Sequence, residues 1–194
     1  NEAIKLATGE YIGFLDHDDI LSQDALYEIV KCINENDNVD FIYSDEDKID
    51  QTGERFEPYF KPDYSPETLE CNNYITHFVV VKKELINEVG MLDSNFNGAQ
   101  DFDFVLRATK NAKEVVHISK ILYHWRVHRD STANVADAKP YAYEAGIRAA
   151  KVHIERCGRN GVVEDGQDVP GIYKIKYEIE GNPKVSILIP NRDN

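Results

Sequence analysis

The sequence predicts an α/β fold in which short buried strands alternate with amphipathic helices. The strand signal is clearest in Tyr11–Leu15, a mostly apolar run between Gly9 and a polar segment. The helix signal is clearest over 23–35, where apolar residues recur on one face. Acidic residues follow the first strand directly, as Asp16-His17-Asp18-Asp19. Open α/β sheets bind their ligands at the carboxyl ends of strands, so these acids are the first candidates for a functional site.

The other elements are predicted from turn and capping residues. A helix over 1–8 is expected to end at Gly9, Ser22 can cap the helix over 23–35, and Ser65-Pro66 begins a short helix. A turn at Gly53 joins two edge-like segments within 46–60, and 158–170 is predicted to be a turn-rich linker. Further strands are predicted over 40–45, 74–81, 114–118, 121–127, 173–179 and 185–190, and further helices over 84–89, 101–111 and 139–157.

Composition narrows the functional classes. The chain has 194 residues, which suits one domain or one domain plus a fragment, and its 42% apolar content supports a core. The net charge of −13, with 35 acids and 22 bases, argues against nucleic acid and against a polybasic contact with lipid. We find no transmembrane run and no signal peptide. Three scattered cysteines (Cys32, Cys71 and Cys157) are expected to be reduced cytosolic thiols.

The acids at 16–19 suggest a divalent cation. Side chains alternate along a strand, so Asp16 and Asp18 are expected to point the same way and to share Mg²⁺ or Mn²⁺. Close carboxylates repel one another unless a positive charge lies beside them. The alternative is a polar turn in which Asp18 or Asp19 caps the next helix.

Three stretches together resemble the family 2 glycosyltransferases of the GT-A fold. They are Ala7–Asp19, Asn97–Asp103 and Leu122–Ser131. Shorter segments (Tyr43–Asp47, Lys61–Asp63 and Asn73–Ile75) resemble the branch that builds bacterial surface polysaccharides, of the rhamnan type. The resemblance covers about 1–135 and implies a partial GT-A domain, a Rossmann-like mixed sheet flanked by helices. The nucleotide-binding N-terminal half of such a domain is missing from this sequence.

The resemblance also implies a division of the chain. Residues 1–135 are expected to form the acceptor- and metal-side half of the domain, and 136–182 a helix and linker with one strand. Residues 183–194 contain Val185–Pro190, which resembles the first strand of the family and is expected to begin a second, truncated glycosyltransferase domain. Alternatively this strand is the last of the present domain, or it fills the place of the missing first strand.

The resemblance assigns roles to the acids. Asp16 and Asp18 are implied as the metal and diphosphate motif, with Asp19 in a supporting or capping position. Asp101 is implied as the catalytic base, and Gln100 stands beside it where many relatives have Glu. The alternative for Asp101 is capping of a helix N-terminus.

A late element, Arg126-x-His128-x-x-Ser131, resembles the segment that closes over the diphosphate in this family. His128 is implied as a further metal ligand and Arg126 as a phosphate contact, with Ser131 beside them. His124 is a second candidate. Trp125 is expected in the core or, alternatively, against a sugar. His17, His77, His117 and His153 give no argument for chemistry, and Asp45, Glu46 and Asp47 are expected to form a solvated loop or to line the acceptor side.

The resemblance implies transfer of a sugar from a nucleoside-diphosphate sugar to a hydroxyl of a growing cell-surface polysaccharide, with Mn²⁺ or Mg²⁺ and with inversion. The acceptor would be a glycan or a lipid-linked glycan, and the expected location is cytoplasmic, at the inner face of the membrane if the parent protein associates with it peripherally. A second hypothesis is an inactive module that binds an acceptor or partner. A third, a metal-dependent phosphate-ester hydrolase, would need more His or Asp ligands at fixed spacing.

Overall fold

The computed structural model describes residues 1–127, 140–166, 171–179 and 181–190. A mixed six-stranded sheet forms its centre, in the order β1 (Tyr11–Phe14), β5 (Val79–Lys82), β3 (Phe41–Ile49), β6 (Val115–Arg126) and β2 (Ile20–Leu21), with β4 (Arg55–Tyr59) paired to β3. β3 and β6 are parallel, whereas the other pairs are antiparallel. This arrangement confirms the predicted α/β class with a mixed sheet.

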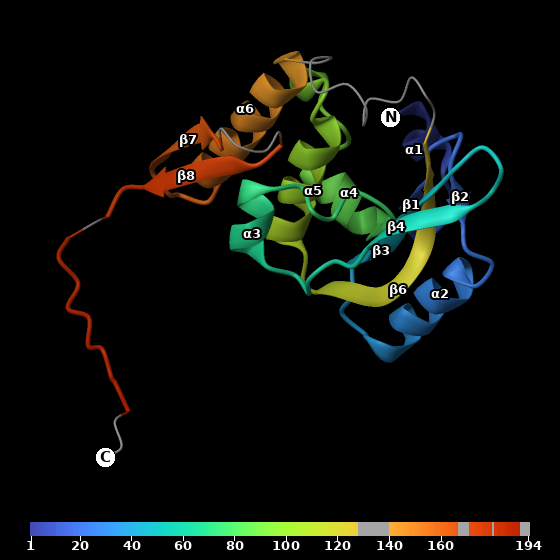
Figure 1. Ribbon diagram of the computed structural model, residues 1–194, viewed down its shortest axis with the longest axis horizontal. Helices are drawn as coiled ribbons and strands as arrows, with labels where there is room; N and C mark the ends of the chain where they lie inside the picture. Colours follow the sequence, from blue (N-terminus) through green and yellow to red (C-terminus); the bar gives the residue numbers. More distant parts are fainter. Residues whose placement is uncertain (128–139, 167–170, 180, 191–194) are drawn as a thin grey trace.

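Two cores cover the two faces of the sheet, and the alternation of side chains explains them. On β3, Phe41 and Tyr43 belong to the larger core, and Ile42 belongs to the smaller one. On β5, Val79 and Val80 divide in the same way. Figure 1 shows α2 (Ala25–Glu35) on one side of the sheet and the other long helices on the opposite side. These other helices are α4 (Lys83–Val89), α5 (Gln100–Asn111) and α6 (Pro140–Arg156).

Smaller elements complete the chain. α1 (Glu2–Leu6) precedes β1, α3 (Pro66–Cys71) begins at the Ser65 cap as predicted, and the short helix η1 (Ser94–Phe96) precedes α5. A hairpin of β7 (Gly161–Asp165) and β8 (Tyr173–Tyr177) lies beside α6 (Figure 1). In the described part of the chain, no helix has both the length and the apolar character that a membrane crossing needs.

Several boundaries differ from the prediction. The segments predicted as two strands, 114–118 and 121–127, form the single strand β6, and the predicted linker at 158–170 contains β7. α1 ends at Leu6 with Ala7 as its C-terminal cap, so Gly9 does not end this helix. Residues 181–190 contain no helix or strand, and this segment extends away from the body (Figure 1). The predicted strand at 185–190 is therefore absent, and its apolar side chains, such as Leu188, are exposed.

Candidate active site

The acidic residues after β1 lie in a turn. β1 ends at Phe14, and the backbone N–H of Asp19 donates to the carbonyl of Asp16 at 3.2 Å. Strand alternation therefore does not govern Asp16 and Asp18, and that part of the prediction was wrong. One donor atom each of Asp16, Asp19 and His77 instead lie within 4.8 Å of one another. Two carboxylates and an imidazole form a donor set that suits Mn²⁺.

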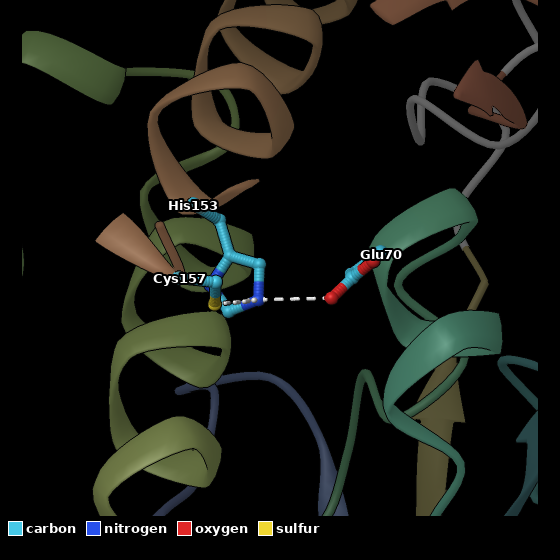
Figure 2. A group of neighbouring side chains, drawn as sticks. All are labelled: Glu70, His153 and Cys157. Atoms are coloured by element: carbon cyan, nitrogen blue, oxygen red, sulfur yellow. Dashed lines mark hydrogen bonds and ion pairs between the residues drawn. The ribbon is translucent and has the colours of Figure 1, made fainter. Parts of the chain in front are cut away.

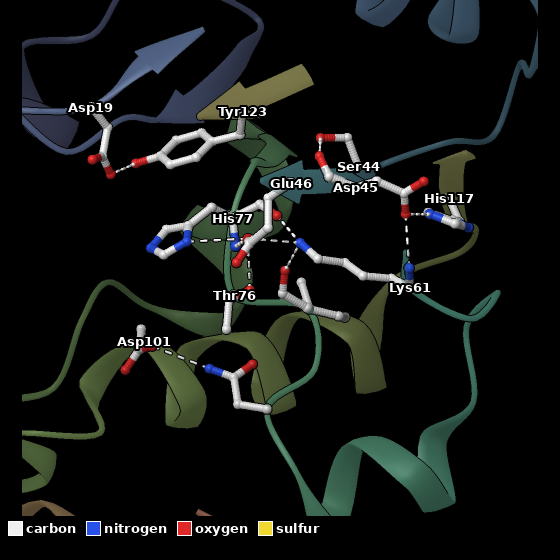
Figure 3. Close-up of polar contacts among 12 residues, drawn as sticks. Asp19, Ser44, Asp45, Glu46, Lys61, Thr76, His77, Asp101, His117 and Tyr123 are labelled. Carbon is white, nitrogen blue, oxygen red and sulfur yellow. Dashed lines mark hydrogen bonds and ion pairs between the residues drawn. The ribbon is translucent and has the colours of Figure 1, made fainter. Parts of the chain in front are cut away.

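Strand β6 holds this turn in place. The Tyr123 hydroxyl donates to one carboxylate oxygen of Asp19 (Figure 3). It also accepts from the backbone N–H of Asp16 at 3.3 Å. The other Asp19 oxygen accepts from the backbone N–H of Arg126 at 2.7 Å. Burial raises the pKa of Tyr123, and the bond to Asp19 raises it further, so this hydroxyl stays a donor. Both carboxylate oxygens of Asp19, a residue expected only in a supporting or capping position, are thus fixed by hydrogen bonds.

Arg126 contacts the backbone of the same turn. Its Nε donates to the carbonyl of Asp18 at 2.7 Å, and one terminal nitrogen donates to the carbonyl of Asp50 at 3.3 Å. The Asp18 carboxylate lies 3.6 Å from Nδ1 of His17. Arg126 therefore stabilises the turn, and the roles of Arg126 toward phosphate and of Asp18 toward metal remain predictions.

His77 is a candidate site residue to which the sequence analysis gave no role. Its Nδ1 lies 3.2 Å from Oε2 of Glu46, and its Nε2 lies 3.9 Å from Oδ2 of Asp16. Its ring stacks on Tyr123 with 4.7 Å between centroids. Burial alone would lower the pKa of His77, but the hydrogen bond and the charge of Glu46, together with Asp16, raise it. A carboxylate on one ring nitrogen is the usual way in which proteins orient a ligating histidine.

Glu46 is buried beneath His77. Its Oε2 accepts from Lys61 Nζ at 3.0 Å, from Thr76 Oγ1 at 2.9 Å and from the backbone N–H of His77 at 3.1 Å (Figure 3). Burial alone would raise the pKa of Glu46, yet the His77 bond and the Lys61 charge lower it to about 2. Glu46 is therefore ionised at neutral pH, and its hydrogen bonds fix the orientation of His77.

The three acids of β3 are buried, so the expectation of a solvated acidic loop was wrong. Asp45, Glu46 and Asp47 expose 2%, 7% and 4% of their surface. Asp45 accepts from the backbone N–H of Lys61 at 2.9 Å and lies 2.8 Å from Nε2 of His117. β3 continues through these acids because each has a cationic or polar partner on a neighbouring segment.

Asp101 lies in the first turn of α5 and is exposed. One of its oxygens accepts from Nδ2 of Asn73 at 3.1 Å (Figure 3). Gln100 accepts from the backbone N–H of Gly98 at 2.7 Å. Asp101 and Gln100 line a cavity of about 300 Å³ together with Asp16 and His77. The predicted base and the acidic turn, 85 positions apart in the printed numbering, therefore face one cavity.

Asp103, by contrast, is part of the framework. It is fully buried, and it binds Arg107 of α5 at 2.8 Å and Arg156 of α6 at 2.9 Å. Asp101 and Asp103 of the same helix thus differ in environment, one exposed and one buried, because nearby helical positions point in different directions.

The late element is only partly described. His124 is buried and lies 2.6 Å from Asp47 on the neighbouring strand. Trp125 is half-buried, 6.1 Å from the His77 ring between centroids, and packs against the smaller core. Neither is among the described residues that line the cavity of Asp16 and Asp101. His128 and Ser131 lie outside the described residues.

A second group with metal-donor atoms lies between α3 and α6. Nε2 of His153 lies 3.4 Å from Glu70 and 3.6 Å from Sγ of Cys157 (Figure 2). Arg159 donates to the same Glu70 oxygen as His153 contacts, and Tyr177 donates to the other. Burial alone would raise the pKa of Glu70, but bonds from His153, Arg159 and Tyr177 lower it to about 2. Because Arg159 supplies the positive charge here, we interpret this group as an ion-pair and hydrogen-bond network that links α3, α6 and β8.

The chain is similar in sequence and in fold to several known proteins. TarS of S. aureus, residues 1–349 in complex with UDP-GlcNAc, superimposes with a TM-score of 0.58 over 79% of this chain and 45% of its own, at 20% identity. An uncharacterized protein of Sinorhizobium fredii is 42% identical over the whole chain, and the O-antigen biosynthesis protein RfbC of Myxococcus xanthus is 36% identical over the whole chain. The chain spans 22% and 15% of the lengths of these two relatives.

The mixed sheet and its flanking helices are those of the GT-A class of glycosyltransferase folds. The model of Glycosyl transferase family 2 matches residues 1–90, which contain the acidic turn, Glu46 and His77. The similarity to glycosyl transferase family 2 therefore includes the part of the chain that holds these residues.

Proposed function

We propose that this chain is the metal- and acceptor-side part of a glycosyltransferase acting in surface-polysaccharide synthesis. The donor is a nucleoside-diphosphate sugar, and the acceptor is a hydroxyl of a glycan or lipid-linked glycan. The observation that carries the proposal is the single cavity lined by Asp16, His77 and Asp101. The names of the M. xanthus relative and of an E. coli chondroitin synthase, 26% identical over 91% of this chain and 24% of its own length, favour a polysaccharide product.

A divalent cation, Mn²⁺ or Mg²⁺, fits the donor set at the acidic turn. Asp16, Asp19 and His77 would hold it, and Asp18 is the further candidate from the sequence. Oxygen donors with one imidazole suit both the charge and the hardness of such an ion. When bound, the ion offsets the negative charge that develops on the departing nucleoside diphosphate.

Asp101 is the residue that we propose as acceptor of the proton. Its carboxylate is exposed in the first turn of α5 and lines the cavity that also contains Asp16 and His77. In an inverting transfer the acceptor oxygen bonds to the anomeric carbon while the bond from that carbon to the diphosphate oxygen breaks. The electron pair leaves with the diphosphate, and the hydroxyl proton passes to Asp101. Asn73, on one carboxylate oxygen, keeps the other oriented for this task.

For the location we propose the cytoplasm, with peripheral association of the parent protein at the inner face of the membrane. The proposed donor, a nucleoside-diphosphate sugar, is supported by TarS, which has the same fold and was solved with UDP-GlcNAc and with UDP. A lipid-linked acceptor would bring the site to the membrane surface.

The proposal is tested by titrating the ¹⁵N-labelled chain with Mn²⁺, first alone and then with UDP, GDP or dTDP. Paramagnetic broadening is expected first at the amides of Asp16, Asp19 and His77, and one nucleotide is expected to tighten Mn²⁺ binding. Broadening confined to an acidic segment elsewhere, such as 164–165 on β7, would contradict the metal assignment. Mn²⁺ binding at the turn without a response to any nucleotide would favour the module that binds an acceptor or partner.

A further inference from the structure

A second cavity, of about 260 Å³, adjoins Asp101. Its other described walls include Asn72 and Asn73 after α3, Gly98 before α5, and Tyr143 and Tyr173 from α6 and β8. Asp101 lines this cavity as well as the one that contains Asp16 and His77. The predicted base Asp101 therefore lies between two cavities, one that contains the candidate metal ligands and one that does not.

Asn73 supplies an independent sign of a ligand. An ionised carboxylate only accepts hydrogen bonds, so the contact with Asp101 fixes Nδ2 of Asn73 toward it and Oδ1 away from it. Oδ1 is buried and accepts no hydrogen bond from the described residues. Buried polar atoms nearly always have a partner, and an unpaired one costs roughly 1–3 kcal/mol. Asn73 also lines the cavity, so a hydroxyl donor bound there would satisfy this atom after a small rotation of the amide.

The walls have the chemistry of a carbohydrate site. Tyr143 is half-exposed, and the Phe102 and Tyr173 rings stack with 5.7 Å between centroids. Aromatic faces suit the apolar faces of sugars, and amides suit their hydroxyls. At Gly98, with φ +96°, a Cβ atom would come within 2.9 Å of the Ala142 backbone, so α6 closes tightly on this side.

The electrostatics favour an uncharged ligand. The described lining contains no Lys or Arg, and its ionised group is Asp101. Burial raises the pKa of Tyr173 to about 12, and the nearby charges of Asp101 and Asp165 contribute. A carboxylate on the ligand would be repelled by the charge of Asp101, and the described lining has no cation to offset that repulsion.

We propose that this second cavity binds a neutral sugar residue of the acceptor glycan, and that Asn73 hydrogen-bonds one of its hydroxyls while holding Asp101. The inference rests on the proposed function and adds the place and the class of the acceptor. The attacking hydroxyl then reaches Asp101 from the second cavity, and the donor sugar reaches it from the cavity of Asp16 and His77.

The test maps amide shifts of the unaltered ¹⁵N-labelled chain with millimolar methyl glycosides. The neutral probes are those of glucose, galactose, rhamnose and N-acetylglucosamine, and the acidic probe is that of glucuronic acid. At least one neutral glycoside is expected to shift the amides of Asn73, Gly98, Tyr143 and Gly171, with a much smaller response to the acidic one. No response at these amides to any neutral probe, or an equal response to the acidic probe, would overturn the inference.

Variants then test individual walls. Tyr143→Ala and Asn73→Ala are each expected to weaken the responding glycoside by roughly 5- to 10-fold, the loss of one packing or hydrogen-bonding group. Tyr27→Ala, on the exposed face of α2, is the matched control and should leave the affinity unchanged. Equal affinity in all three variants would place the sugar elsewhere.

The Mn²⁺ titration separates this inference from the proposed function. Mn²⁺ broadening at the acidic turn without any glycoside response would overturn the acceptor cavity and leave the proposed metal site standing. A glycoside response at Asn73 without Mn²⁺ binding at the turn would support the cavity and contradict the metal-dependent transfer.

Discussion

Nδ1 of His77 lies 3.2 Å from Oε2 of Glu46, and the opposite nitrogen of the same ring faces Asp16 at 3.9 Å. The buried anion therefore fixes the orientation of the imidazole, and Lys61 balances its charge at 3.0 Å. This relationship connects the interior of the sheet with the acidic turn, since the ring orientation decides which donor atoms can meet one cation.

His77→Ala is expected to lower Mn²⁺ affinity by at least about tenfold, because it removes one of three converging donors. Isothermal titration calorimetry with Mn²⁺ measures the change. His17→Ala is the matched control, since His17 lies in the acidic turn with its side chain 96% exposed and is not in the donor group. Equal affinities of the two variants would exclude His77 as a ligand.

Asp18→Ala and Asp19→Ala distinguish two metal sites. One is the Asp16 and Asp18 motif that the sequence predicts, and the other is the donor group of Asp16, Asp19 and His77 in the structure. We expect Asp18→Ala to remove metal-dependent nucleotide binding if the sequence motif holds the ion. Asp19→Ala should weaken the metal and also destabilise the chain by roughly 1–3 kcal/mol, since Tyr123 and the Arg126 backbone lose their acceptor. Urea denaturation and Mn²⁺ titration of both variants give the two quantities. A fully stable Asp19→Ala chain would contradict the contacts described for the turn.

Asp101→Asn is expected to reduce sugar transfer by the full-length parent protein by about 10²–10⁴-fold, because the amide cannot accept the acceptor proton. Mn²⁺-dependent nucleotide binding should survive. A joint loss of binding and transfer would refute the assignment of Asp101 as base.

Asp103→Asn is expected to act on stability instead. Asp103 is fully buried between Arg107 and Arg156, and loss of one partner in a buried ion pair costs roughly 3–5 kcal/mol. Asp101→Asn provides the comparison, since the exposed Asp101 should change the free energy of unfolding much less. Chemical denaturation of the isolated chain measures both.

Glu70 predicts a pH dependence of stability. Its pKa is about 2 in the folded chain, against 4.5 for an unperturbed glutamate, so its contribution is present above about pH 4.5 and is lost as the pH falls toward 2. The shift corresponds to roughly 3 kcal/mol. Glu70→Gln should therefore lower the free energy of unfolding at pH 7, and the difference from the unaltered chain should shrink in acid.

Glu164→Gln on β7 is the control for this pH dependence, because Glu164 is a surface residue paired with Lys176. Thermal melting at pH 7, 4.5 and 3 distinguishes the two. A Glu70 effect that stays constant from pH 7 to pH 3 would show that the carboxylate charge is not what stabilises this group.

Local patterns predicted the α/β class, the Ser65 cap and the helix that carries Asp101, because each depends on residues close in sequence. The two halves of β6 were predicted as separate strands since exposed Ser119 and Lys120 interrupt the apolar pattern. In the structure these two residues fall at a register shift of one continuous strand, between the pairs Ser44 with Ile118 and Asp45 with Ile121.

The candidate site residues that the sequence analysis did not select depend on contacts between distant segments. His77 gains its role because β5 lies beside β1 and β3, and Glu46 is buried only because Lys61 and His77 come to it from later in the chain. A run of three acids in isolation resembles a surface loop, so the ion pairs that allow their burial were not visible. The resemblance of Tyr43–Asp47, Lys61–Asp63 and Asn73–Ile75 to the family was the available signal, because Glu46, Lys61 and Asn73 all belong to these segments.

The parallel pairing of β3 with β6 sets an order in which a nascent chain can fold. Asp47 and His124 meet across this pair although they lie 77 positions apart, and closing so long a loop costs entropy before any pairing is gained. The hairpin of β3 and β4 can form early, but Tyr123 and Arg126 emerge from the ribosome much later. The acidic turn at 16–19 precedes β6 along the chain and is held by Tyr123 and Arg126, so it acquires its final shape only after β6 has been made.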